Sequence, residues 1–360
     1  MKPIVLSVIF LFFCFSTRNV YAQDSSKAKN IIIITIDGFR WQELFSGADK
    51  NIISNTNFVK DTSLTKQLFW DTTADLRRKK MMPFLWSVIA AKGQIYGNRF
   101  LNNKSDVTKW YKISYPGYNE MLTGYADPFF IPNIPINNRN KTVLEYLNTT
   151  ENYIGKTVAF TSWNIFPYIF NEKRSKLPLN INDVETNVIN KKNTHYDMLT
   201  FLNAKDYINN HHPKVVFLGF GQTDEFAHEG RYDLYLQQAS AIDRMIAELW
   251  YMLQTDPFYK DNTTLIITTD HGRGASPSSW FTHGLFTKGS SNTWFAVMGP
   301  EIIPAGEIKV NEQIYQKQNA PTLALLVGEK FNPIKTSSDK SCQPLSLNPR
   351  YTNTNFLSSK

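Results

Sequence analysis

The stretch IIIITIDGFRW (31–41) holds six consecutive β-branched residues, Ile31 to Ile36, followed at once by Asp37 and Gly38. Such a run predicts a strand that is buried on both faces, as strands of parallel sheets are. Four further apolar runs have the same character. The five predicted strands are Ile31–Ile36, Thr157–Phe160, Val215–Phe220, Leu265–Thr269 and Trp294–Met298.

Helical patterns separate these strands. The longest covers Asp233–Leu253, and the others cover Thr142–Leu147 and Met82–Lys92, which we expect to end at Gly93 as a C-cap. Strands that alternate with helices predict an α/β fold, here a three-layer α/β/α sandwich with a mostly parallel sheet. In such folds ligands bind at the carboxyl ends of the strands.

The chain of 360 residues is 42% hydrophobic, which is enough for one large domain, and we place that domain at residues 23–335. Two polar and aromatic segments, 44–76 and 125–140, are predicted to be loop insertions around the ligand-binding edge. Residues 336–360 are predicted to form a polar C-terminal tail. The formal net charge of +8 only weakly favours anionic ligands, and no nucleic-acid-binding motif accompanies it.

The N-terminus has the pattern of a secretory signal peptide: Lys2, an apolar block from Ile4 to Phe15, and Ala22 before Gln23. We expect residues 1–22 to be removed, which predicts a periplasmic or secreted protein, with association with the cell surface left open. A retained N-terminal anchor is the competing interpretation. After cleavage only Cys342 remains, so no intrachain disulfide is possible, and no apolar segment long enough to span a membrane is left.

Acidic residues and histidines follow three of the predicted strands. Each alone has an ordinary structural explanation, such as a helix cap or a turn. Together they would meet at one edge of the sheet, and Zn²⁺ accepts mixed imidazole and carboxylate ligands. Two such ions need about six or seven protein ligands. The candidates are Asp37, Asp224, His228, Asp270, His271 and His283, with Ser114 as a possible seventh.

Ser114 stands before a short predicted helix, Pro116–Leu122, in the stretch KISYPGYNEMLTG (112–124). One interpretation makes its hydroxyl a nucleophile, because a helix N-terminus and a bound cation both favour the alkoxide. The other interpretation makes Ser114 only the N-cap of that helix. The sequence pattern alone leaves both open.

Five segments in this order resemble the alkaline phosphatase superfamily: TIDGFRW, SYPGYNEMLTG, TDEFAH, TDHGRG and THG. The resemblance is greatest to its type I phosphodiesterase/nucleotide pyrophosphatase branch and to related bacterial phosphatases. It covers about residues 30–300 and implies an alkaline-phosphatase-like fold with two zinc ions. One zinc would be held by Asp37, Asp270, His271 and the nucleophile Ser114, where this branch usually has threonine. The other would be held by Asp224, His228 and His283.

The resemblance is looser for residues that would contact the substrate. The family phosphodiesterases place an asparagine about twenty residues after the nucleophile, and three candidates stand here: Asn133, Asn137 and Asn138. Lys173 and Arg174 resemble a basic pair that binds phosphate monoesters in some bacterial phosphatases. The alternative for this pair is an exposed basic loop.

We therefore predict a secreted hydrolase of phosphoric monoesters or diesters with a serine nucleophile and two Zn²⁺ ions, although Mn²⁺ or another divalent cation is compatible with the same ligands. Its substrate would be a small-molecule or glycan-linked anionic ester. A sulfatase is one alternative, but Tyr118 stands where the sulfatase motif has arginine, and three histidine ligands suit zinc better than calcium. A non-catalytic binding homologue is the other alternative.

Overall fold

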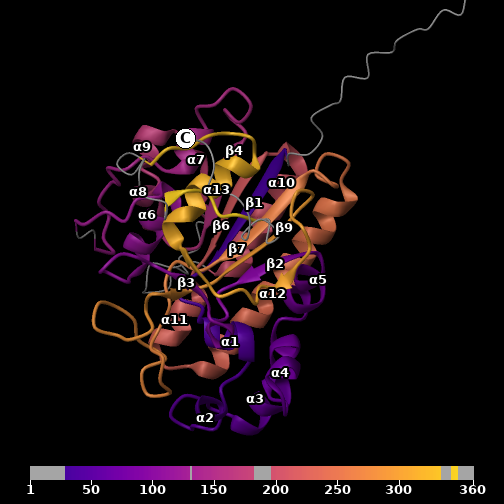
Figure 1. Cartoon of the computed structure of the whole chain (residues 1–360), viewed down its shortest axis with the longest axis vertical. Helices are drawn as coiled ribbons and strands as arrows, with labels where there is room; N and C mark the ends of the chain where they lie inside the picture. Colours follow the sequence, from indigo (N-terminus) through magenta and orange to yellow (C-terminus); the bar gives the residue numbers. More distant parts are fainter. Residues whose placement is uncertain (1–28, 130–131, 182–195, 334–341, 348–360) are drawn as a thin grey trace, which may run out of the picture.

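The computed structural model describes residues 29–129, 132–181, 196–333 and 342–347. A large twisted sheet runs through the centre of the molecule and helices cover both of its faces (Figure 1). The sheet has eight strands in the order β10-β2-β9-β7-β1-β6-β4-β5, and a second sheet has the order β11-β3-β8. The strands are β1 Asn30–Ile36, β2 Gly93–Tyr96, β3 Asn103–Asp106, β4 Thr157–Thr161, β5 Leu179–Ile181, β6 Val215–Phe220, β7 Thr263–Thr268, β8 Asn292–Thr293, β9 Phe295–Met298, β10 Gly306–Glu307 and β11 Glu312–Tyr315.

The predicted α/β sandwich and the five predicted strands are confirmed. β1 pairs in parallel with β6 and β7, and β4 pairs in parallel with β5 and β6. Only β9 runs against its neighbours in the large sheet, because its pairs with β2 and β7 are both antiparallel. The sheet is therefore mostly parallel, as the β-branched runs predict.

The isoleucine run at the start of the domain serves two cores. Ile32, Ile34 and Ile36 belong to one buried cluster, while Ile31 and Ile33 belong to the other. Because successive strand residues point to opposite faces, β1 is apolar on both sides and anchors a helix layer on each. α1–α4, the π-helix Leu85–Ile89, α10, α11 and α12 contribute buried residues to the first cluster, and α6–α8 and α13 contribute to the second.

The helices occupy most of the segments predicted to be helical. α12 covers the predicted Asp233–Leu253 with one residue more at its N-terminal end and two more at its C-terminal end. The predicted Met82–Lys92 contains a π-helix followed by α5. The helices are α1 Trp41–Ser46, α2 Lys50–Ile53, α3 Thr62–Phe69, α4 Ala74–Met81, the π-helix Leu85–Ile89, α5 Ala90–Lys92, α6 Ser114–Thr123, α7 Val143–Leu147, α8 Phe166–Ile169, α9 Glu172–Ser175, α10 Asp197–His211, α11 Gln222–His228, α12 Tyr232–Thr255 and α13 Asn319–Leu326, with 3₁₀ turns at Arg99–Leu101 and Gln316–Gln318.

The prediction of a loop at 44–76 is wrong. This segment contains α2, α3 and parts of α1 and α4, which lie together at the bottom of Figure 1. Three of its polar residues are N-caps: the side chains of Asp49, Asp61 and Thr73 accept hydrogen bonds from backbone N–H groups of α2, α3 and α4. By contrast, the described residues of 125–140 form neither helix nor strand, as predicted.

Gly93 is the C-cap of α5, as predicted, although not in the left-handed conformation common at that position. Its φ of −143° is extended, and the residue begins β2. A Cβ atom there would lie 2.2 Å from the carbonyl oxygen of Val297 on β9, so the close approach of two strands requires glycine.

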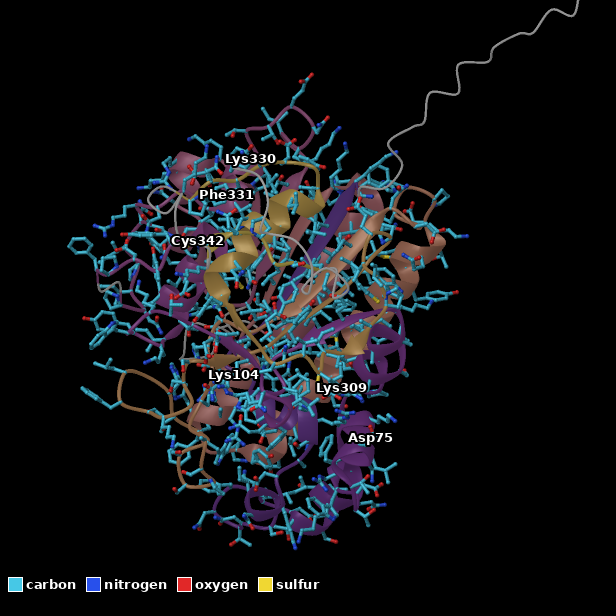
Figure 2. The ribbon with its side chains drawn as sticks, in the orientation of Figure 1. Asp75, Lys104, Lys309, Lys330, Phe331 and Cys342 are labelled. Atoms are coloured by element: carbon cyan, nitrogen blue, oxygen red, sulfur yellow. The ribbon has the colours of Figure 1, made fainter. Side chains whose placement is uncertain are left out.

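Two predicted regions lie largely outside the described residues. These are the signal peptide, residues 1–22, and the tail, residues 336–360, of which residues 342–347 are described. Cys342 is buried and lines a small pocket beside α13 with Lys330 and Phe331 (Figure 2). In the described part of the chain, none of the helices has both the length and the apolar character that crossing a membrane requires.

Candidate metal centre

The register of the sheet brings the predicted acidic residues to one edge. Ile36 of β1 is paired with Phe220 of β6, and Thr35 is paired with Thr268 of β7. The residues that follow these three strands therefore emerge side by side. Asp37 follows β1, Asp224 stands in the first turn of α11 after β6, and Asp270 and His271 follow β7.

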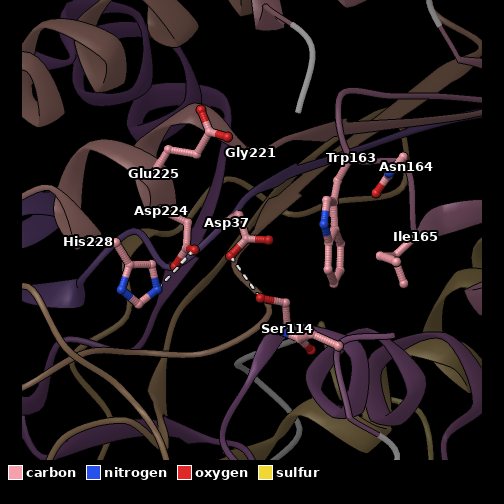
Figure 3. Close-up of a pocket in the computed structure, with 10 residues that line it drawn as sticks. Asp37, Ser114, Trp163, Asn164, Ile165, Gly221, Asp224, Glu225 and His228 are labelled. Atoms are coloured by element: carbon pink, nitrogen blue, oxygen red, sulfur yellow. Dashed lines mark hydrogen bonds and ion pairs between the residues drawn. The ribbon is translucent and has the colours of Figure 1, made fainter. Parts of the chain in front are cut away.

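Ser114 is the first residue of α6 and is buried, with 3% of its surface exposed. The N-cap position is held by Ile113, so Ser114 does not cap the helix. Its hydroxyl oxygen lies 3.5 Å from Oδ1 of Asp37 and 3.3 Å from Nε2 of His271. Figure 3 shows the hydroxyl pointing toward the carboxylate of Asp37. The interpretation of Ser114 as the N-cap is therefore wrong, and its role as a nucleophile stays a prediction.

Asp37, Asp270, His271 and Ser114 form a first cluster. Nε2 of His271 lies 3.5 Å from Oδ1 of Asp37 and 3.4 Å from Oδ2 of Asp270. Bonds of about 2.0–2.1 Å to a tetrahedral zinc place neighbouring ligand atoms about 3.3–3.4 Å apart. The four side chains are therefore spaced as ligands of one such ion would be.

Asp224, His228 and His283 form a second cluster. Nε2 of His228 lies 3.3 Å from Oδ2 of Asp224 and 2.9 Å from Nε2 of His283, which in turn lies 3.6 Å from Oδ1 of Asp224. His271 connects the clusters, because its Nε2 is 3.9 Å from Oδ1 of Asp224. All seven residues predicted to bind metal or to act as nucleophile are therefore brought together.

Backbone carbonyls orient two of the histidines. Nδ1 of His271 is 3.0 Å from the carbonyl of Gly272, and Nδ1 of His283 is 3.0 Å from the carbonyl of Lys112. A proton on each Nδ1 donates to that carbonyl and leaves Nε2 as the atom with a lone pair. Burial lowers the pKa of both imidazoles, so they are neutral at pH 7, which is the form that binds metals.

The first cluster has the electrostatics of a cation site. Burial, with the neighbouring charge of Asp270, raises the pKa of Asp37 to about 8, and burial raises the pKa of Asp270 to about 7. Oδ2 of Asp270 is buried and has no hydrogen-bond partner among the described residues. A divalent cation would satisfy this oxygen and offset the repulsion between the carboxylates. Imidazole, carboxylate and hydroxyl donors fit zinc or a similar ion.

A pocket of about 400 Å³ opens next to the two clusters. This volume is within the range typical of small-molecule sites. Figure 3 shows Asp37, Asp224, His228 and Ser114 on one side and a wall of Trp163, Asn164 and Ile165 on the other. The residues lining the pocket are Asp37, Ser114, Asn133, Trp163, Asn164, Ile165, Gly221, Asp224, Glu225 and His228.

A family model matches residues 102–285, just over half of the chain, and it describes the metalloenzyme superfamily. The chain belongs to the metalloenzyme superfamily. The matched segment includes Ser114 and the second cluster, together with Asp270 and His271 of the first. No curated protein sequence matches this metalloenzyme.

Solved structures resemble the metalloenzyme in fold. A protein of the alkaline phosphatase superfamily from Vibrio parahaemolyticus is 12% identical with a TM-score of 0.52, over 88% of this chain and 69% of that one. The phosphonate monoester hydrolase SpPMH from Silicibacter pomeroyi is 12% identical with a TM-score of 0.53, over 84% and 74%. BT1596, a 2-O GAG sulfatase, is 13% identical with a TM-score of 0.53, over 93% and 76%.

The predicted resemblance to the alkaline phosphatase superfamily is confirmed. At such low identities the structural similarities establish the fold of the metalloenzyme and not its substrate. The branch within the superfamily stays a prediction.

The asparagines predicted to contact substrate have different positions in the metalloenzyme. Asn133 lines the pocket, and its Oδ1 accepts a hydrogen bond of 2.9 Å from the backbone N–H of Tyr115, the residue after Ser114. Asn138 is buried, and its amide donates to the carbonyl of Ile169, so it supports the loop. Asn137 is exposed and is not among the residues that line the pocket.

The structure does not place Lys173 and Arg174 where the predicted contact with a substrate would need them. Neither residue is among those lining the pocket. The guanidinium of Arg174 makes two hydrogen bonds, of 2.7 and 2.8 Å, to the carboxylate of Glu145 and also donates to three backbone carbonyls. Lys173 is exposed. Arg174 therefore holds the loop residues 138–140 in place, and Lys173 is an exposed basic residue, although it lies in the short helix α9 and not in a loop.

Sequence reasoning missed several residues near the clusters. Three of them, Trp163, Asn164 and Ile165, follow β4. The rule that ligands bind at the carboxyl ends of strands could therefore have identified them as pocket residues. Arg273 stands two residues after His271 and is buried against Asp224. The sequence indicates only that Tyr118 replaces the arginine of the sulfatase motif. In the structure its hydroxyl donates a hydrogen bond of 3.2 Å to Oδ2 of Asp37.

Proposed function

We propose that this metalloenzyme hydrolyses phosphoric esters, with Ser114 as the nucleophile and a divalent cation at each cluster. The observation that carries the proposal is the position of the Ser114 hydroxyl, 3.3 Å from His271 and 3.5 Å from Asp37 at the wall of the pocket. Two bound cations would supply positive charge beside the attacking and the leaving oxygen of the ester.

The side chains of the two clusters have separate tasks in this proposal. Asp37, Asp270 and His271 would hold a divalent cation beside Ser114, and its positive charge would favour the ionised form of the hydroxyl, whose proton passes to solvent. That oxygen forms a bond to phosphorus as the bond to the leaving alcohol breaks, and water protonates the departing oxygen. Water then attacks the phosphoserine from the side of Asp224, His228 and His283, releases the phosphate product and restores the serine.

We further propose that the substrate carries a single negative charge on its ester, as a phosphodiester does. None of the ten residues that line the pocket is lysine or arginine, so the second charge of a monoester dianion has no basic partner there. The basic pair predicted to bind a phosphate monoester, Lys173 with Arg174, is not part of the lining.

The wall opposite the clusters suits the alcohol portion of the ester. Trp163 is fixed edge-to-face against the buried ring of Phe166, with centroids 6.1 Å apart, and offers an indole to the pocket. Oδ1 of Asn164 is buried and has no hydrogen-bond partner among the described residues. An alcohol group with a hydroxyl donor would satisfy this acceptor.

A sulfate ester also carries one negative charge, and a sulfatase is among the structures similar in fold, so it is the second candidate. Turnover of bis(p-nitrophenyl) phosphate, p-nitrophenyl phosphate and p-nitrophenyl sulfate, each with zinc and with chelator, separates the possibilities. We expect zinc-dependent cleavage of the diester above the monoester. Cleavage of the sulfate alone would refute the proposal, and cleavage of none of the three would support the non-catalytic alternative.

Export is part of the same proposal. It rests on the signal-peptide pattern of residues 1–22. Expression of the full chain in a Gram-negative host, followed by N-terminal sequencing of the periplasmic protein, should give a chain that starts at Gln23. An uncleaved chain in the membrane fraction would instead indicate a retained anchor.

A further inference from the structure

We propose that Arg273 is a positioning residue that orients the carboxylate of Asp224 for the second cation. The inference rests on the proposed pair of cation sites. Arg273 is 1% exposed, and its guanidinium contacts Oδ1 of Asp224. It also donates from Nε to the carbonyl of Gly38 at 3.2 Å, from Nη1 to that of Phe281 at 2.7 Å and from Nη2 to that of Asp224 at 3.2 Å.

These contacts join three segments that carry ligands. Gly38 follows Asp37 of the first cluster, and Phe281 stands two residues before His283 of the second. Asp224 itself belongs to α11. One planar guanidinium with several fixed donors therefore sets the relative positions of all three segments, which a lysine ammonium with three donors on a flexible stem cannot do.

The carboxylate of Asp224 is the group that Arg273 orients. Its Oδ1 contacts the guanidinium, and its Oδ2 lies 3.3 Å from Nε2 of His228. Holding one oxygen fixes the rotation of the carboxylate about its Cβ–Cγ bond, and so fixes the direction of the other oxygen. Partners of this kind, which hold a metal ligand from behind, typically change metal affinity by about 10–100-fold when they are removed.

An independent observation at Gly38 supports this close packing. Gly38 has a φ of +58°, and a Cβ atom there would lie 2.8 Å from Nε of Arg273 and 2.8 Å from Oδ1 of Asp224. The backbone N–H of Gly38 donates to Oδ1 of Asp270 at 3.0 Å. The backbone of this residue is thus bonded to a ligand of the first cluster on one side and to Arg273 on the other.

A purely structural role for Arg273 predicts a different result. In that case its loss lowers the stability of the fold, and both cation sites weaken together or not at all. A positioning role instead predicts selective loss at the second site, because Asp224 belongs to the second cluster while Asp37, Asp270 and Ser114 keep their own supports.

The test measures bound zinc, which does not depend on turnover. Arg273→Met and Arg273→Lys are dialysed against buffered zinc at a series of free concentrations, and the zinc per chain is measured by mass spectrometry. We expect the wild type to bind two ions. We expect Arg273→Met to keep one ion at wild-type affinity and to bind the second roughly 10–100-fold more weakly, with Arg273→Lys between the two.

A second buried arginine supplies the matched control. Arg40 is 2% exposed, pairs with Glu43 and donates to the carbonyl of Gly274 at 2.8 Å. Arg40→Met should be less stable, by urea denaturation, but should still bind two zinc ions at wild-type affinity.

Two results would overturn the positioning role: wild-type affinity for both ions in Arg273→Met, or equal weakening of both sites. If Arg273→Met does not fold, the same measurement on Arg273→Lys tests the positioning role. Wild-type affinity for both zinc ions in Arg273→Lys would then refute that role. A wild type that binds two ions but cleaves no phosphoric ester would refute the proposed function and leave this inference standing.

Discussion

Replacement of Gly38 by alanine tests how tightly the two clusters are packed against each other. The φ of +58° places this residue in the left-handed region, where a residue with a Cβ atom costs about 1–2 kcal/mol. The added Cβ would also lie 2.8 Å from Nε of Arg273 and from Oδ1 of Asp224, well inside van der Waals contact. Forcing a methyl group into a packed interior costs about 1–3 kcal/mol more.

The chain offers a control for the backbone part of this cost. Gly155 has a φ of +68°, and a Cβ atom there meets nothing within 4 Å. Gly155→Ala should therefore lose only the conformational cost of about 1–2 kcal/mol. The difference between the two variants isolates the contact with Arg273 and Asp224, which we expect to be about 1–3 kcal/mol.

Urea denaturation at pH 7 measures both free energies of unfolding, and dialysis against buffered zinc measures the bound ions. We expect Gly38→Ala to lose more stability than Gly155→Ala and also to bind its second zinc more weakly, because relief of the clash moves Arg273 or Asp224. If Gly38→Ala matched Gly155→Ala in stability and bound zinc like the wild type, the argument from close packing would be wrong.

Four further expectations follow from single contacts. Ser114→Ala should lower kcat for bis(p-nitrophenyl) phosphate by roughly 10³-fold or more, with partial recovery in Ser114→Thr, because only threonine restores a hydroxyl. Asn164→Ala should raise KM for diesters with a hydroxylated alcohol while kcat stays close to wild type, since Asn164 faces the pocket and not the clusters. Zinc at a free concentration of 100 Kd should stabilise the protein by about 2.7 kcal/mol per site, and chelator should reverse the rise in Tm. Burial raises the pKa of Asp243 to about 6, so the folded protein keeps a proton on Asp243 that the unfolded chain releases near pH 4. The free energy of unfolding should therefore fall as pH rises from about 4 to 6. In Asp243→Asn, urea denaturation should show this fall reduced by roughly 1 kcal/mol per pH unit.

The parts of the fold that sequence predicts well depend on local patterns. The run Ile31–Ile36 is apolar on both faces of a strand, and the structure uses both faces. Parallel pairing then aligns the ends of β1, β6 and β7, so residues placed just after these strands must meet. For that reason the cluster around Asp37, Asp224 and Asp270 could be predicted without knowing any distance.

The remaining features depend on partners distant in sequence or on the choice between two uses of one residue. The sequence around Arg174 suggests an anion-binding residue. In the structure, however, its guanidinium is hydrogen-bonded to the carboxylate of Glu145, 29 positions earlier in the chain. Asp49 and Asp61 are acceptable both in a loop and at a helix N-terminus, and only the backbone N–H groups that they accept from distinguish the two. Composition carries no information on either point.

The crowding of charged groups in the two clusters affects how tightly they would bind a cation. Three carboxylates, Asp37, Asp224 and Asp270, crowd around the buried imidazole of His271, and Arg273 is the arginine that contacts one of them. Burial favours the protonated form of both Asp37 and Asp270, and repulsion from Asp270 adds to this effect at Asp37. A cation must displace those protons, so binding should strengthen as pH rises, and the site is best occupied when the Ser114 hydroxyl is also most readily ionised. In the proposed function, the same crowding that makes these carboxylates costly to the fold therefore couples cation binding to the ionisation of the Ser114 hydroxyl.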